Sequence, residues 1–144
     1  MVIPFTDREL KNAWRNLACA ATLCSVDRVA NTRRLLLLYA VECGLKAVWL
    51  KRKRQDVFDE EDVGDVGHDI YKLIKDLHVK HDLKIFKTIG LKPITINSVS
   101  VSRNFGLKDL HQVWRYGGVC VSPGDSDCEQ QLHDIMKWLE GELR

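Results

Sequence analysis

Glu42 is the residue whose surroundings most need a chemical explanation, because it lies within the apolar run LLLLYAVECGLKAVWL of residues 35–50. A carboxylate among so many apolar residues is costly unless a cation or hydrogen-bond donors satisfy it. Lys46 follows four residues later, which places both side chains on one helix face in a favourable order for an ion pair. Two interpretations stay open: a local pair that supports the helix, or a carboxylate that meets a cation from another helix in a polar pocket.

Two further motifs carry polar groups at predicted helix ends. Asp69 falls in the first turn of a predicted helix, where it complements the helix dipole, and His68 either caps that turn or donates into a buried network with Glu42. Arg115 and Tyr116 precede two glycines that suit a helix end, and the arginine fork matches a carboxylate or a phosphate. We therefore predict a polar network that binds a ligand or fixes helix register: Glu42, Lys46, His68, Asp69, Arg115 and Tyr116.

Other kinds of site lack the residues that they need. The five cysteines have no Cys-x-x-Cys spacing, and no set of cysteines and histidines matches a zinc site. There is no G-x-S-x-G elbow, no Walker loop and no G-x-G-x-x-G loop. We therefore expect neither a metal nor a cofactor.

The composition is that of a globular protein that works in a reducing compartment. The chain has 144 residues, 45% hydrophobic and 29% charged, which suits one domain over residues 1–144. Its net charge of +2 does not by itself indicate nucleic-acid binding. An odd number of cysteines in apolar stretches favours reduced thiols. No signal-peptide pattern is evident, and charged residues interrupt the apolar run, so we expect a cytoplasmic protein that does not contact a membrane.

Hydrophobic periodicity predicts four to five helices. The capping box from Thr6 to Glu9 opens a helix that ends near residue 24, and a longer helix covers about residues 27–54. An acidic loop follows, then helices begin near residue 68 and residue 105, and a second capping box at residues 126–129 opens the last helix. Alternation near residues 94–101 predicts a short strand-like insert. The expected fold is all-α, an antiparallel up-and-down bundle that the insert merely decorates.

Three motifs together resemble those of HEPN (higher eukaryotes and prokaryotes nucleotide-binding) domains, in the order that this family has them. YAVECGLKA, residues 39–47, resembles the helix-two signature in which Lys-Ala follows a glutamate by four residues. GHDI, residues 67–70, is similar to the start of the third helix, and Arg115-Tyr116 is similar to the Arg-Tyr of the last part of the domain. The resemblance implies a helical bundle, often a homodimer, that binds RNA or a nucleotide in a toxin–antitoxin, phage-defence or stress-response system.

Some members of this family are metal-independent ribonucleases. In these, an arginine and a histidine are separated by four to six residues, and the arginine would bind the scissile phosphate while the histidine assists proton transfer across a dimer cleft. Here Arg103 and His111 come nearest, with seven residues between them and Gly106 interrupting a continuous helix. Three hypotheses therefore stand: an RNA- or nucleotide-binding module, a metal-independent endoribonuclease using Arg103 and His111, and an adaptor or antitoxin-type protein that docks on a partner of the same system.

Overall fold

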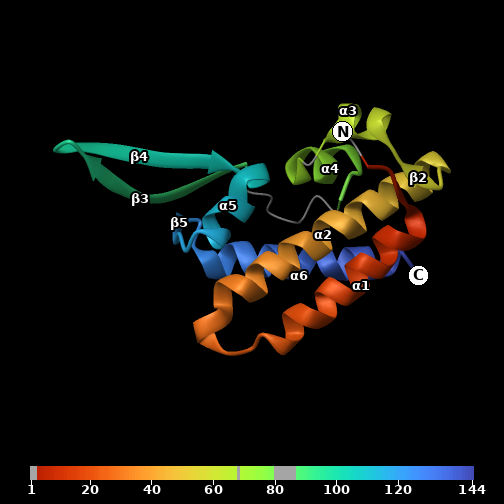
Figure 1. The fold of residues 1–144 in the computed structure, drawn as a ribbon, viewed down its shortest axis with the longest axis horizontal. Helices are drawn as coiled ribbons and strands as arrows, with labels where there is room; N and C mark the ends of the chain where they lie inside the picture. The colour runs from red at the N-terminus through yellow and green to blue at the C-terminus, as the bar shows by residue number, and fades with distance from the viewer. Residues whose placement is uncertain (1–2, 68, 80–86) are drawn as a thin grey trace.

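Three long helices make the body of the protein (Figure 1). The structure is a computed structural model that describes residues 3–67, 69–79 and 87–144. Helix α1 spans Asp7–Leu23, α2 spans Ala30–Lys53 after a short 3-10 turn η1 (Asp27–Val29), and α6 spans Asp125–Glu142. Helices α2 and α6 run in the same direction, and α1 runs against both (Figure 1). Helix α2 therefore lies at the centre, where it packs on the other two.

The local signals at the first two helices are confirmed. The Thr6 hydroxyl accepts the Glu9 backbone N–H at 3.1 Å, and the Glu9 carboxylate accepts the Thr6 backbone N–H at 3.1 Å, so the capping box is complete. Helix α1 buries one face and α2 is buried along its middle, as the periodicity predicts. The fully buried residues of α2 are Ala40, Val41, Leu45, Ala47, Val48 and Leu50.

The prediction of an all-α bundle is wrong, because the fold is mixed α and β. Of the described residues, about 63% are helical, in six α-helices and two 3-10 turns, and 19% are in strands of two small antiparallel sheets. One sheet pairs β1 (Phe5–Thr6) with β2 (Val57–Phe58). The other has the order β4-β3-β5, formed by β3 (Thr88–Ile96), β4 (Val99–Gly106) and β5 (Cys120–Ser122).

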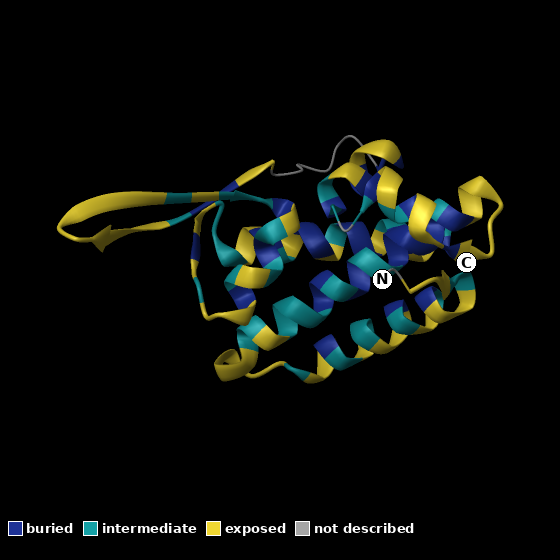
Figure 2. Ribbon diagram, turned by 45° about the horizontal axis from the view of Figure 1, so that its top comes forward, coloured by how far each residue is buried: buried dark blue, intermediate teal, exposed yellow. Residues whose placement is uncertain are grey.

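The expected insert near residues 94–101 is the outer part of a long β3–β4 hairpin, which we call the arm (residues 88–106). Asn97 and Ser98 connect its strands with φ of 50° and 65°, the two positive values that a tight hairpin turn of type I′ requires. The arm projects from the body, and its outer half is exposed on both faces (Figures 1 and 2). The strands continue into the body, where Ile89 is fully buried.

Several short elements lie where a loop or one longer helix was expected. The acidic stretch contains α3 (Glu60–Val66), which begins at a capping box between Asp59 and Asp62. Asp62 is buried and also accepts the indole N–H of Trp49 at 3.1 Å. Helix α4 (Ile70–Asp76) comes next, and the region after the arm forms η2 (Leu107–Asp109) and α5 (Leu110–Arg115). Helix α6 begins at Asp125 with no side-chain cap, so the capping box expected at residues 126–129 is wrong.

None of the helices in the described part of the chain combines the length and the apolar character that a membrane crossing requires.

Candidate functional site

A cleft of about 280 Å³ lies between α2 and α5, and we call it the α2–α5 cleft. Helix α2 provides one wall, α5 and η2 provide the opposite wall, and α4 contributes one apolar residue. Three basic or imidazole side chains therefore face a tyrosine and a carboxylate. The lining residues are Leu38, Tyr39, Glu42, Ile70, Lys108, His111 and Arg115.

Glu42 and Lys46 form the ion pair that their spacing predicts. The Glu42 Oε1 and Lys46 Nζ atoms are 3.4 Å apart, and the two side chains are 20% and 10% exposed. The Lys46 ammonium also lies 5.1 Å from the centre of the Phe58 ring, a favourable cation–π distance. The pair holds a negative charge at the edge of the cleft beside a compensating cation.

Arg115 is held at the mouth of the cleft by a contact across its two walls. Its Nη2 donates to the Tyr39 hydroxyl at 3.0 Å, and this hydrogen bond raises the pKa of Arg115 above its already high ordinary value. The guanidinium lies 5.9 Å from the centre of the Tyr116 ring. The Arg115 side chain is exposed. It is a permanent cation with five N–H donors at the opening of the cleft.

His111 is oriented by the turn that precedes its helix. Its Nδ1 lies 3.0 Å from the Lys108 carbonyl oxygen. Since a carbonyl only accepts, Nδ1 carries the proton, and in the neutral ring Nε2 is then the atom with the lone pair. His111 therefore presents a proton acceptor in the same cleft as Arg115 and Lys108.

Only some residues of the predicted polar network lie close to one another. Glu42 and Arg115 line the same cleft, as expected. Asp69 is the N-cap of α4, where its side chain accepts the Lys72 backbone N–H at 3.2 Å, a structural role. Tyr116 is 78% exposed and lines another cleft. The role predicted for His68 lies outside the described residues.

Arg103 and His111 line different clefts of the protein. Arg103 is on β4, and its Nε and Nη2 donate to the Lys92 carbonyl at 3.0 and 2.9 Å. Together with Tyr116 it lines a second cleft of about 290 Å³, which we call the arm-base cleft. The proposed catalytic pairing of Arg103 with His111 across a dimer stays a prediction.

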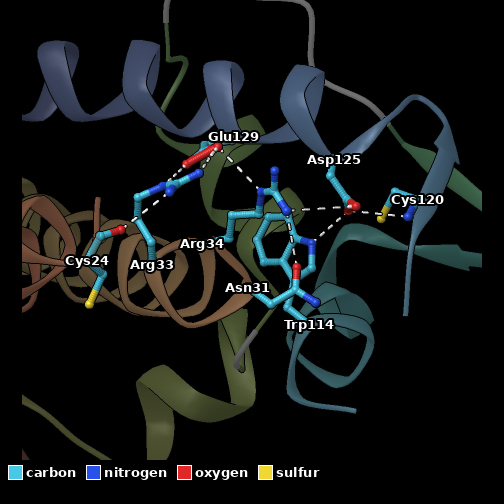
Figure 3. A network of polar contacts seen from close by, with 8 residues as sticks. All are labelled: Cys24, Asn31, Arg33, Arg34, Trp114, Cys120, Asp125 and Glu129. Atoms are coloured by element: carbon cyan, nitrogen blue, oxygen red, sulfur yellow. Dashed lines mark hydrogen bonds and ion pairs between the residues drawn. The ribbon is translucent and has the colours of Figure 1, made fainter. Parts of the chain in front are cut away.

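The strongest charged cluster of the described chain was missed by the sequence reasoning (Figure 3). Arg33 at the start of α2 binds Glu129 of α6 through two contacts, Nε–Oε1 at 2.6 Å and Nη2–Oε2 at 3.1 Å. Arg34 adds a contact from Nε to Glu129 Oε2 at 3.4 Å. These contacts lower the pKa of Glu129 below its ordinary value, chiefly through the hydrogen bonds from Arg33.

Asp125 extends this cluster to the cleft wall. Its Oδ1 accepts the Trp114 indole N–H at 2.9 Å and the Cys120 backbone N–H at 3.2 Å, and its Oδ2 lies 3.9 Å from Arg34 (Figure 3). It therefore joins α5, β5 and α6. The only hint in the sequence was the spacing of Asp125 and Glu129, which puts two carboxylates on one helix face.

Cys43, which follows the cleft residue Glu42 in the chain, is not suited to nucleophilic chemistry. All five cysteines, each at a described position, are free thiols. Burial and the adjacent Glu42 carboxylate raise the pKa of Cys43 to about 11, so its thiol stays protonated near neutral pH. Groups of three or more metal-binding side chains are also not found in the described ranges.

Comparisons of the chain with known protein families, with curated proteins and with solved structures find no match. The chemistry of the α2–α5 cleft must therefore be argued from its own residues.

Proposed function

We propose that the α2–α5 cleft binds the phosphate backbone of single-stranded RNA, or the phosphates of a nucleotide, as a HEPN-like module would. The observation that carries the proposal is the placement of Arg115, Lys108 and His111 around one cleft, opposite Tyr39. A guanidinium and an ammonium bind phosphate oxygens by charge-assisted hydrogen bonds. The Glu42 carboxylate is offset by Lys46, so it repels an incoming phosphate less than an isolated carboxylate would.

The resemblance to HEPN domains supports RNA as the ligand, in a toxin–antitoxin, phage-defence or stress-response setting. Among the cleft residues, Tyr39 offers an aromatic face for a base, as is common in recognition of unpaired RNA. The free cysteines support a reducing compartment, and the cytoplasm is our proposed location. A homodimer and a partner protein of the same system are part of this proposal.

Binding of a labelled single-stranded RNA at several salt concentrations, followed by fluorescence anisotropy, tests the proposal. We expect Arg115→Ala and Lys108→Ala each to weaken binding and to reduce the slope of log K against log salt by about 0.7, the value for one phosphate contact on a single strand. Lys137→Ala is the matched control, because it removes the same charge from an exposed position of α6. Unchanged binding by both cleft variants, or no binding by the parent protein, would contradict the proposal.

A second candidate function is metal-independent cleavage of RNA, favoured by the orientation of His111. An imidazole whose Nδ1 is held by a backbone carbonyl offers Nε2 as a general base, and Arg115 lies in the same cleft to bind the phosphate. Incubation of RNA with the protein in chelator, using His111→Ala, Arg115→Ala and Arg103→Ala, tests this candidate. Loss of cleavage in His111→Ala and Arg103→Ala would support the pair inferred from the sequence, whereas loss in His111→Ala and Arg115→Ala would support the cleft.

A further inference from the structure

One face of the arm is apolar from the core to the tip except for Arg103. The register pairs Ile94 with Val101 and Ile96 with Val99, and directly opposite residues share a face of the sheet. Nearer the body, past a bulge between Leu91 and Ile94, the same face continues with the pairs Leu91–Arg103 and Ile89–Phe105. The other face carries polar pairs, such as Thr95–Ser100. The arm therefore has one mainly apolar face and one polar face, the pattern of a hairpin that is buried on one side.

The outer half of this apolar face has no cover from the described part of its own chain. Ile94, Ile96, Val99 and Val101 are 38%, 50%, 61% and 37% exposed. The arm extends away from the helices, so the body does not lie over these residues (Figure 2). Four aliphatic side chains in contiguous cross-strand pairs form the kind of exposed apolar patch that marks an interaction site.

We propose that this face is a homodimer interface, in which the arms of two copies pack face to face in antiparallel fashion about a two-fold axis near the Ile94–Val101 pair. The inference locates the homodimer that belongs to the proposed function, and it does not depend on RNA binding. A two-fold interface brings one surface against an identical surface, so the surface must be complementary to itself. The arm meets this condition because residues 94–101 carry no charged side chain, and two copies therefore bring no like charges together at the axis.

The arm-base cleft gives the second half of the interface. It lies at the body end of the arm and is lined by three residues of the same face, Leu91, Arg103 and Phe105, together with Val113 and Tyr116. The outermost pair of the arm is Ile96–Val99. Along β3 about five residues separate Ile96 from Leu91, a distance of roughly 16 Å. In the antiparallel arrangement each tip therefore reaches the arm-base cleft of the other copy.

The polar groups of the two regions also match. The tip turn of one copy, Asn97-Ser98, would lie against the polar cleft side chains of the other, Arg103, Asp109 and Gln112, where amide and hydroxyl groups can pair with a guanidinium, a carboxylate and an amide. A stable interface buries about 800 Å² from each partner, more than four aliphatic side chains offer. The reciprocal insertion of two tips into two clefts supplies the additional area, which favours a second copy over a partner that covers the tip alone.

Sedimentation equilibrium over a dilution series tests the proposal with a pair of neighbouring substitutions. Val99→Asp places a carboxylate on the apolar face, and Ser100→Asp places the same charge on the opposite, polar face of the same strand. Because a buried unpaired charge is costly, we expect Val99→Asp to raise the dimer Kd by more than about tenfold and Ser100→Asp to change it by less than about threefold. Both positions are exposed, so circular dichroism should show unchanged folding for both variants.

A photo-crosslinking side chain at position 96 locates the contact. In a mixture of unlabelled and nitrogen-15-labelled protein, we expect crosslinks between differently labelled copies that join position 96 to the segment from Leu107 to Tyr116. A parent protein that is monomeric at every concentration would overturn the proposal, as would a dimer that Val99→Asp leaves intact. Equal loss of RNA binding in Val99→Asp and Ser100→Asp, with a monomeric parent, would assign the arm to nucleic acid instead and would also overturn it.

Discussion

At the scale of single residues, the charge cluster around Glu129 makes a contribution to stability that depends on pH. Its carboxylate accepts two hydrogen bonds from Arg33 and one from Arg34, and the three side chains are 13%, 22% and 15% exposed. The folded-state pKa of Glu129 is lowered from an ordinary value near 4.5. The charged carboxylate therefore stabilises the fold above that value, and its contribution is lost as the pH falls through the lowered pKa.

Glu129→Gln tests this cluster. We expect it to reduce the free energy of unfolding by about 1.5 to 3 kcal/mol at pH 7, because it weakens hydrogen bonds between charged groups. The difference from the parent should shrink below about pH 4.5, where the unfolded carboxylate becomes protonated. Urea unfolding followed by circular dichroism at pH 7 and pH 3.5 measures both values. Glu140→Gln, an exposed position on the same helix, is the control, and an equal effect there would show that the loss is not specific to the cluster.

Gly44 shows how closely the helices of the body approach. A Cβ added there would lie 2.6 Å from Cδ1 of Leu139 on α6 and 3.0 Å from Cδ1 of Trp14 on α1. In Gly44→Ala the better helix propensity of alanine adds about 1 kcal/mol, but overpacking costs about 1 to 3 kcal/mol. We therefore expect a net loss of up to about 2 kcal/mol. A Cβ added at Gly64 in α3 would meet no neighbouring group within 4 Å, so Gly64→Ala should gain up to about 1 kcal/mol in free energy of unfolding. Thermal melts measure both variants, and an equal gain in Gly44→Ala and Gly64→Ala would contradict the close approach of the helices at Gly44.

At the scale of elements, Asp125 determines where the basic wall of the α2–α5 cleft sits. Short helices such as α5 have little stability of their own and depend on tertiary contacts. The Trp114 indole of α5 and the Cys120 amide of β5 both donate to Asp125 at the start of α6. Since Arg115 follows Trp114 directly, this anchor fixes the position of the guanidinium without contacting the cleft.

Asp125→Ala should therefore loosen one element while the body stays folded. We expect amide exchange in α5 and β5 to be faster by about tenfold or more, because losing these hydrogen bonds lowers the free energy of local opening by about 1.4 kcal/mol or more. Amides of α1 and α2 should exchange as in the parent. Hydrogen exchange followed by mass spectrometry measures this at peptide level. Asp127→Ala is the matched control, because Asp127 also lies in the first turn of α6 but is exposed. Uniformly faster exchange in all helices would mean that Asp125 supports the whole fold instead.

The elements also show which parts of the fold could be predicted from the sequence. The start of α1 and the buried middle of α2 follow from a capping box and from local periodicity, and the Glu42–Lys46 pair follows from helical spacing. The full length of the arm could not be predicted, because the bulge after Leu91 breaks the alternation of apolar and polar residues along the inner part of β3. Glu129 and Arg33 are 96 residues apart, and periodicity shows which face is buried but not which element covers it.

At the scale of the whole molecule, the protein separates into a helical body and a projecting arm whose outer half adds little to the core. The residues from Lys92 to Ser102 are all exposed, whereas Ile89 and Leu107 at the two ends of the arm are buried. The α2–α5 cleft is lined entirely by residues outside the arm. Stability and the proposed phosphate site therefore belong to the body, and the outer arm is the part to which we assign the proposed association.

Replacing residues 92–102 with Asn-Gly tests this division, because the Leu91–Arg103 pair would then close a two-residue hairpin of the favoured type. We expect the shortened protein to be a monomer with a melting temperature within about 2 °C of the monomeric Val99→Asp variant, since the removed side chains bury little apolar area. The proposed RNA binding should keep its salt dependence, because Lys108 and Arg115 are retained. Sedimentation equilibrium, a thermal melt and anisotropy measure the three properties. A loss of several degrees would show instead that the outer arm supports the body, since a domain of this size shifts by roughly 4 °C for each kcal/mol lost.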